Sequence, residues 1–365
     1  MADFDVADLA LQAIAPGNRL LYDDKGLPSV MVYVPKFKLS EVLTGGADTY
    51  HPAFIINGTF VDGIYISKYQ NVVEDGRAYS LPGRDPKTSI TWDTARGYCE
   101  AKGTGWHMMT KAEWAMLGLW CKAHGIFPKG NNQYGKDSTE TAYTAIPATY
   151  GTGTDAGKIY HTATGTGPLT WSHDGTMKGI MDLNGNVSEW TGGIRTVYGE
   201  LQLLVNNNAA DKSHSQAADS DQWKALKASD GTFITPNGSG TTTGSVKVIL
   251  SSGKPKYAVT IGSGETGDTI SGGLHTITCS SDISDAAKLV LRAYGMLPES
   301  GAVAADYGDG DSVTFSNNLA EGLIYSGGYY SNASSAGVFY SSGKSGRSHL
   351  FGTVGFRAAY AVIPT

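Results

Sequence analysis

Hydrophobic and polar residues change their spacing several times along the chain, and each spacing predicts a type of element. Residues 7–14 place apolar side chains at helical intervals. Residues 30–37 are β-branched and aromatic, and residues 51–72 have the same strand-forming character. Asn-Gly at 57–58 and Asp-Gly at 62–63 are turn-forming pairs within this second stretch. We therefore expect a short helix followed by several strands.

Two longer helices are predicted after these strands. Residues 89–103 and 110–126 both place apolar residues every three or four positions, the spacing of one helix face. Thr110 and Glu113 form a capping-box pair, which satisfies free backbone amides at the start of the second helix. Since both helices come early, with strands before and after them, the predicted fold class is α+β rather than alternating βαβ.

The chain changes in composition after the first half. Residues 196–319 contain Gly-, Ser-, Thr- and Asn-rich stretches and one helix-like piece at 283–297. Strand patterns return near residue 322 and continue to the end. We predict three parts, namely an N-terminal arm at 1–28, one domain formed by 29–195 plus 320–365, and an insertion within that domain at 196–319. The arm or the insertion could form a trimer or attach the protein to a tail, and the oligomer considered is a homo-trimer.

Charge and hydropathy exclude several classes of function. Only 17% of the residues are charged, the net charge is −6 and no basic run stands out, so nucleic-acid binding is not expected. No apolar stretch approaches the roughly 18 residues that a membrane span requires. The first residues lack the basic start and apolar block of a secretory signal, so we expect synthesis in the cytoplasm.

The sequence offers little for catalysis. Its three cysteines, Cys99, Cys121 and Cys279, are sparse and odd in number, which fits buried thiols in a reducing compartment better than disulfides or a metal site. There is no Gly-x-Ser-x-Gly elbow, His-Glu-x-x-His pair, P-loop or dinucleotide fingerprint. A non-enzymatic protein is therefore expected.

Four stretches, in order, resemble motifs of the formylglycine-generating enzyme, or sulfatase-modifying factor, family. They are "MVYVP", "ITWDTARGYCEAKGTGWHMMTKAEWAML", "GIMDLNGNVSEWTGG" and "YSGGYY … GRS … VGFRAAY". The resemblance covers about residues 29–195 and 320–365 and implies a C-type lectin-like fold with a large loop-rich insertion. It also implies that some motif residues build the scaffold, namely Trp190, Gly327, Gly328, Gly355, Phe356 and Arg357.

The resemblance does not extend to the enzyme's thiols. The family's oxidase needs a pair of cysteines near the C-terminus to handle copper and oxygen. Here no cysteine follows Cys279, and Ala358 stands where the family commonly has one. We expect a member without this activity, and a divergent oxidoreductase of the same type is the alternative.

The resemblance also implies a structural calcium ion, although no cofactor is expected to be required. In the family, backbone carbonyls and a carboxylate hold the ion. The matching residues here are Asn184, Gly185, Val187 and Glu189. Such oxygen ligands suit a hard cation. The other interpretation is a turn in which Glu189 makes a structural hydrogen bond.

The last segment is rich in Tyr, Ser and Gly, which suits a binding surface. Tyr provides a large and rigid contact area, whereas Ser, Gly and Asn provide adaptable hydrogen bonds. The segment resembles the variable region of diversity-generating retroelement target proteins, which include phage tropism determinants. The resemblance gives these candidate variable, ligand-binding positions: Tyr329, Tyr330, Ser331, Asn332, Ser334, Tyr340, Ser341, Ser342, Lys344, His349, Leu350, Phe351 and Gly352.

The residue types agree with adenine-specific mutagenesis of Asn codons. Trp, Gln, Glu and Met cannot arise that way, and none occurs between residues 329 and 352. Lys344 requires a different codon. We therefore expect a receptor-binding protein of a phage tail or virion, with a protein or glycan receptor on a host cell surface. A variable protein displayed on a cell surface is the alternative.

Overall fold

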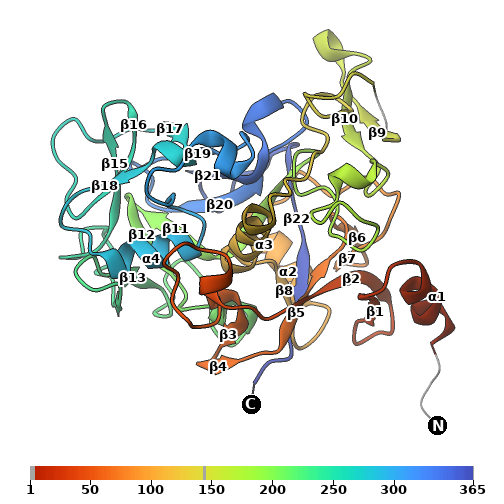
Figure 1. The fold of residues 1–365 in the computed structure, drawn as a ribbon, viewed down its shortest axis with the longest axis horizontal. Coiled ribbons are helices and arrows are strands. Elements are labelled where there is room, and N and C mark those ends of the chain that lie inside the picture. Colours follow the sequence, from red (N-terminus) through yellow and green to blue (C-terminus); the bar gives the residue numbers. More distant parts are fainter. Residues whose placement is uncertain (1–4, 143–144, 365) are drawn as a thin grey trace.

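The structure is a computed structural model that describes residues 5–142 and 145–364. Two large sheets lie around a central helix, and the described residues contain four α-helices (Figure 1). The α+β class predicted from the sequence is confirmed. The helices are α1 (Val6–Ile14), α2 (Trp92–Glu100), α3 (Lys111–His124) and α4 (Asp285–Ala293).

One sheet joins the first strands to the end of the chain. Its order is β1-β2-β5-β23-β8, and all neighbours are antiparallel. The β-branched β2 (Pro28–Pro35) pairs with β1 (Asn18–Tyr22) and β5 (Gly63–Ser67). The last strand, β23 (Ala358–Tyr360), lies between β5 and β8 (Trp106–Met108). Strands from the N-terminal third of the chain therefore hold its C-terminus.

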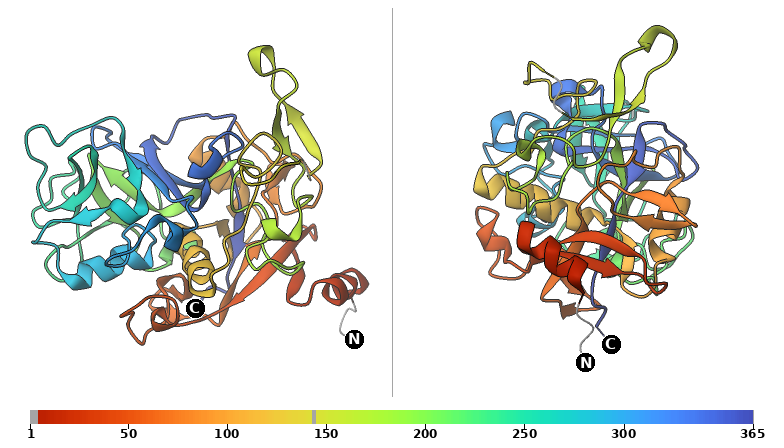
Figure 2. Two further views of the ribbon diagram at one scale, coloured as in Figure 1. Left: turned by 45° about the horizontal axis from the view of Figure 1, so that its top comes forward. Right: turned by 90° about the vertical axis from the view of Figure 1, so that its right-hand side faces the viewer.

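The second sheet has twelve strands, and its main order is β17-β19-β21-β20-β11-β12-β15-β16-β18. Strands β12 to β19 all lie within residues 196–319, so this segment continues the sheet (Figure 2). The strands are β11 (Ser188–Val197), β12 (Glu200–Leu203), β13 (Lys224–Leu226), β14 (Phe233–Ile234), β15 (Lys247–Ser251), β16 (Lys254–Ala258), β17 (Ile270–Gly273), β18 (Thr278–Cys279), β19 (Ser312–Phe315), β20 (Gly322–Gly327), β21 (Gly337–Ser345) and β22 (Val354–Phe356).

Three short hairpins complete the strands: β3 (Ile55–Ile56) with β4 (Thr59–Phe60), β6 (Val72–Glu74) with β7 (Arg77–Tyr79), and β9 (Pro147–Tyr150) with β10 (Ile159–Thr162). The predicted turn at 57–58 is confirmed, with both residues at positive φ. The prediction of a tight turn at 62–63 is wrong. Gly63 instead starts β5, and a Cβ atom there would lie 2.5 Å from the Tyr33 ring.

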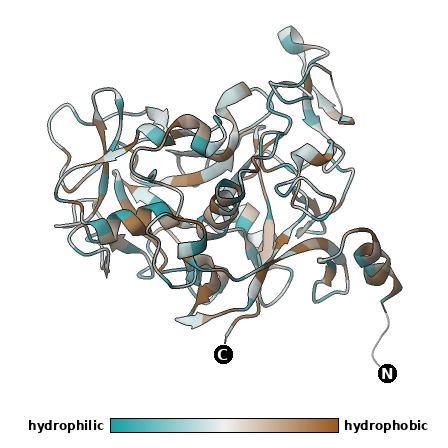
Figure 3. Cartoon of the chain, viewed as in Figure 1, coloured by the Kyte–Doolittle hydropathy of each residue, from teal (hydrophilic) through white to brown (hydrophobic). Residues whose placement is uncertain are grey.

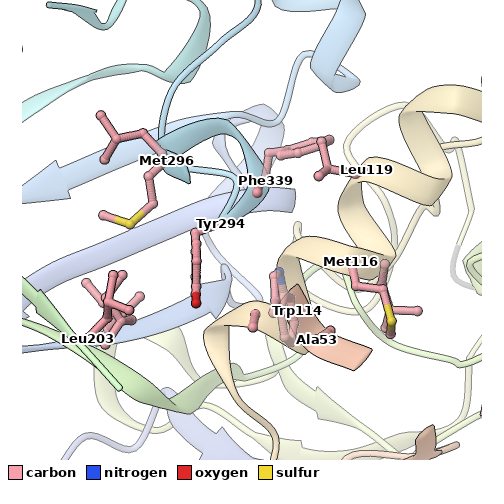
Figure 4. Close-up of a cluster of buried hydrophobic side chains, with 14 of the residues drawn as sticks. Ala53, Trp114, Met116, Leu119, Leu203, Tyr294, Met296 and Phe339 are labelled. Atoms are coloured by element: carbon pink, nitrogen blue, oxygen red, sulfur yellow. The ribbon is translucent and has the colours of Figure 1, made fainter. Parts of the chain in front are cut away.

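The main core joins α3 to residues of the predicted insertion. Figure 4 shows Trp114, Met116 and Leu119 of α3 in one buried cluster with Leu203 of β12 and Tyr294, which follows α4. The capping box predicted at the start of α3 is confirmed. Because one cluster of buried side chains spans these elements, residues 196–319 share their core with the rest of the fold.

The predicted arm at 1–28 contains α1 and β1. Asp8 of α1 is buried and accepts hydrogen bonds from Arg19 Nε (2.8 Å) and the Leu20 amide (2.7 Å). Val6, Leu9 and Ile14 of the same helix are exposed, and much of α1, beside the N-terminus, is brown in Figure 3. Among the described residues, no helix is long and apolar enough to span a membrane.

Candidate functional site

The C-terminal segment passes through both sheets. β20 and β21 are antiparallel neighbours joined by the loop 328–336. A second loop, 346–353, leads to β22, which pairs in parallel with β11. β23 then enters the other sheet. Both loops are therefore attached to strands that are fixed within the fold.

Two glycines form the corner between β20 and the first loop. Gly327 and Gly328 have φ angles of 93° and 77°, which side chains rarely permit. A Cβ atom on Gly328 would also lie 2.5 Å from the Cβ atom of Ala336. These observations support the predicted scaffold role of both glycines.

The other predicted scaffold residues lie in the core below the loops. Trp190 and Phe356 are fully buried, and Trp190 Nε1 donates to the Ile90 carbonyl (3.1 Å). A side chain at Gly355 would meet the Lys87 carbonyl oxygen at 2.6 Å. Packing therefore fixes the path of β22 beside β11.

Arg357 connects several backbone segments from a fully buried position. Its guanidinium contacts both carboxylate oxygens of Glu189, at 2.7 and 2.8 Å. It also donates to the carbonyls of Ser67 (2.8 Å), Lys68 (3.2 Å) and Met181 (3.0 Å). The charge and all these donors are satisfied within the protein, as burial requires.

The predicted variable positions divide into two groups by burial. Those that reach the surface define what we call the variable-loop face. They are Tyr329, Ser331, Asn332, Ser334, Lys344, His349, Leu350, Phe351 and Gly352. Leu350 is 61% exposed, and the rings of His349 and Phe351 stack beside it with centroids 5.4 Å apart.

The second group is buried: Tyr330, Tyr340, Ser341 and Ser342. Tyr340 belongs to the core cluster around Trp190. Ser341 Oγ accepts a hydrogen bond from Lys111 Nζ (2.6 Å). The buried Ser342 hydroxyl has no hydrogen-bond partner among the described residues. In this conformation these four side chains support the face from below and do not reach a ligand.

Two tyrosines from outside the C-terminal segment pack against the buried Tyr330. The rings of Tyr160 and Tyr330 stack with centroids 4.3 Å apart, and Tyr134 lies 5.8 Å from Tyr330. Burial and the neighbouring phenols raise the pKa of Tyr330 to about 12. The sequence analysis missed Tyr134 and Tyr160, because no local pattern links them to a residue so far along the chain.

His161 connects the two loops. Its ring lies 5.8 Å from that of Tyr330, and its Nε2 lies 3.3 Å from the Gly352 carbonyl oxygen. Its Nδ1 lies 2.8 Å from Asp85 Oδ1. Burial acts to raise the pKa of Asp85, but hydrogen bonds from His161 and Thr149 hold it below its usual value. The buried His161 thus links the two loops from below the face.

A comparison with known families identifies the framework. Residues 13–230 match the model of the sulfatase-modifying factor enzyme 1-like domain. The chain belongs to this family. The predicted C-type lectin-like fold of the formylglycine-generating enzyme type is therefore confirmed. The match crosses the predicted boundaries at 28/29 and 195/196 and ends before the C-terminal segment.

Two solved structures are similar to this family member at low identity. PvdO from Pseudomonas aeruginosa is 12% identical over 94% of this chain and 98% of its own, with a TM-score of 0.30. The Major Tropism Determinant P3c variant is 13% identical over 92% of this chain, with a TM-score of 0.28. This chain covers 64% of that protein's length. A search of curated proteins gives no match.

The thiols of this sulfatase-modifying factor family member are unpaired. Cys99 and Cys121 are buried, as predicted, and Cys279 is half-buried. Burial raises the pKa of the Cys99 thiol well above its usual value, that of Cys121 to about 12 and that of Cys279 to about 11. Ala358 is fully buried within β23. Thiols in these surroundings are poor nucleophiles and metal ligands.

Most of the residues matched to the family's calcium ligands contact another side chain of the protein instead. The carbonyls of Gly185 and Val187 and the Glu189 carboxylate converge on the side-chain amide nitrogen of Gln70. The Asn184 carbonyl oxygen instead lies against Gly130, where a Cβ atom would meet it at 1.7 Å. A cation bound by these oxygens would coincide with the Gln70 nitrogen, so the residues as arranged do not fit the ion.

Proposed function

We propose that this chain is a non-enzymatic receptor-binding protein and that the variable-loop face is its binding surface. The observation that carries the proposal is the combination of exposed His349 and Leu350 and half-buried Tyr329 and Phe351 with a buried scaffold. Such a scaffold lets surface residues change without unfolding the protein. We further propose that a retroelement diversifies these residues and that the receptor is a protein or glycan on a host cell.

The composition of the face supports binding. Exposed large hydrophobic residues that cluster mark interaction sites more often than single ones do. Leu350 and the stacked pair of His349 and Phe351 form such a cluster at one loop, and Tyr329 lies on the other. Tyr and similar rings give contact area at a low cost in conformational entropy.

We place the protein on a phage tail or virion, with display on a cell surface as the alternative. A trimer or other homo-oligomer would present several faces at once. Linked sites gain avidity without any new contact. Weak single contacts would then suffice for attachment.

An oxidoreductase of the formylglycine-generating type is the second candidate, because the family match favours it. The three separate, unpaired thiols argue against it. Copper-loaded protein mixed with a Cys-containing peptide gives a direct test. Copper-dependent oxygen consumption would support the enzyme, and its absence would support the binding role.

The binding role can be tested with fluorescently labelled protein on a panel of intact bacterial strains. The variant Tyr329→Ala/Leu350→Ser removes the half-buried ring of Tyr329 and the exposed side chain of Leu350 from the face. We expect cell binding to fall at least about tenfold, as for central contact residues. The control Tyr198→Ala/Val303→Ser changes two exposed residues outside the face and should bind normally. Equal binding by both variants would contradict the proposal.

A further inference from the structure

We propose that the Gln70 side-chain amide replaces the calcium ion that the family resemblance implies, so that this part of the fold is stable without a metal. This inference does not depend on the proposed binding role. It rests on the position of one buried nitrogen atom among oxygen atoms from the segment before β11 and from Glu189 of β11.

Gln70 Nε2 lies at the centre of four oxygens. The distances are 2.8 Å to the Val187 carbonyl, 3.0 Å to Glu189 Oε1, 3.2 Å to the Asp182 carbonyl and 3.4 Å to the Gly185 carbonyl. Carbonyls and a carboxylate are the ligand types that calcium prefers. An amide nitrogen with two hydrogens can satisfy the nearest of them instead.

The amide is held in this orientation from its other end. Gln70 Oε1 accepts a hydrogen bond from Asn186 Nδ2 (2.9 Å), which fixes which end of the amide faces the oxygens. Gln70 and Asn186 are both fully buried. Asn186 has a φ of 61°, so the turn that presents these carbonyls is itself closely defined.

The charges at this position also disfavour a cation. Arg357 already neutralises Glu189, with its guanidinium 2.7 Å from Oε1. A divalent ion beside the same carboxylate would meet this buried positive charge at short range, where repulsion is strong. A neutral amide avoids that repulsion.

Thermal unfolding of the whole chain tests the inference. The wild type is measured in millimolar calcium chloride and in excess EDTA. In Gln70→Glu, a carboxylate replaces the amide and adds oxygens to the four already present. Gln216→Glu is the matched control, because Gln216 is also buried but its Nε2 faces only the Ala209 carbonyl.

We expect the wild-type Tm to be the same in calcium and EDTA within about 1 °C. Gln70→Glu should melt at least about 5 °C lower in EDTA and recover much of that loss in calcium. Gln216→Glu should not recover. A calcium-dependent wild-type Tm would overturn the inference, and so would a Gln70→Glu variant that responds to calcium no more than the control. If Gln70→Glu does not fold, the comparison of the wild-type Tm in calcium with that in EDTA tests the inference by itself.

Discussion

Arg357 and Glu189 form a buried ion pair, with Nη2 2.7 Å from Oε1 and Nε 2.8 Å from Oε2. Arg357 lies between β22 and β23, and Glu189 lies in β11. The pair therefore connects the end of the chain to the centre of the twelve-stranded sheet. This connection fixes the strands from which the variable-loop face is built.

Removal of one partner of this pair should destabilise the fold strongly. Arg357→Met leaves the Glu189 carboxylate buried without its countercharge, so we expect a loss of about 3–5 kcal/mol in the free energy of unfolding. Urea denaturation measures this loss in the free energy of unfolding. Arg84→Met, which removes an exposed pair with Glu74, should have almost no effect. Similar losses in both variants would contradict this account of Arg357.

Ser341 should be structural although it lies among the predicted variable positions. Lys111 Nζ is buried and donates to Ser341 Oγ (2.6 Å), and burial lowers the pKa of Lys111 to about 7. Ser341→Ala removes this acceptor, with an expected loss of about 1–3 kcal/mol in unfolding free energy. Ser334→Ala, on the exposed loop, should change it by less than about 0.5 kcal/mol. A neutral Ser341→Ala would show that position 341 is free to vary.

The buried His51 predicts a loss of stability in acid. His51 Nε2 lies 2.8 Å from the Ala293 carbonyl, and burial lowers the pKa of His51 to about 4. The unfolded chain binds a proton near pH 6.5, so unfolding is favoured as the pH falls from about 6.5 to about 4. Protonation of His51 in the unfolded chain should lower the free energy of unfolding by about 2–3 kcal/mol at about pH 4.5.

Urea denaturation at about pH 7 and about pH 4.5 checks this contribution in His51→Gln. The variant should lose less stability on acidification than the wild type does. His173, with its pKa lowered to about 4, acts in the same direction, whereas Asp182, with its pKa raised to about 6, acts in the opposite one. Both remain in the variant. The exposed His124→Gln is the control, and an equal acid response in all three proteins would contradict the assignment.

Residues 196–319 should be required for folding. Leu203 and Tyr294 lie in the same buried cluster as Trp114 of α3, so removal of the segment opens the main core. We expect a chain with a Gly-Ser linker in place of residues 199–319 to lose its near-ultraviolet circular dichroism. A cooperative unfolding transition in that chain would show that the segment is an independent insertion.

The sequence predicted the elements with local determinants well. The capping box of Thr110 and Glu113 starts α3 as expected, because its hydrogen bonds join residues three positions apart. The turn predicted at 62–63 is absent, since Gly63 is needed for its close approach to Tyr33 rather than for a turn. The continuation of the sheet through residues 196–319 depends on long-range strand pairing, which no local pattern reveals.

The candidate site was predicted in part. The motif residues Trp190, Gly327 and Arg357 lie in the scaffold positions that the resemblance implied. The sequence could not separate exposed from buried positions in β21, because Tyr and Ser suit both. Gln70 was also missed, since its contacts with the segment before β11 join residues more than a hundred positions apart.

The most direct test of the proposed function is population sequencing of the codons for residues 322–365, together with the adjacent DNA. We predict substitutions at positions that reach the surface, such as Tyr329, Asn332 and Leu350, and a nearby near-copy with adenines at those sites. The codons for the buried Ser341 and Ser342 should stay fixed. Invariant codons throughout the variable-loop face, without any template repeat, would contradict diversification and leave an ordinary lectin-like surface.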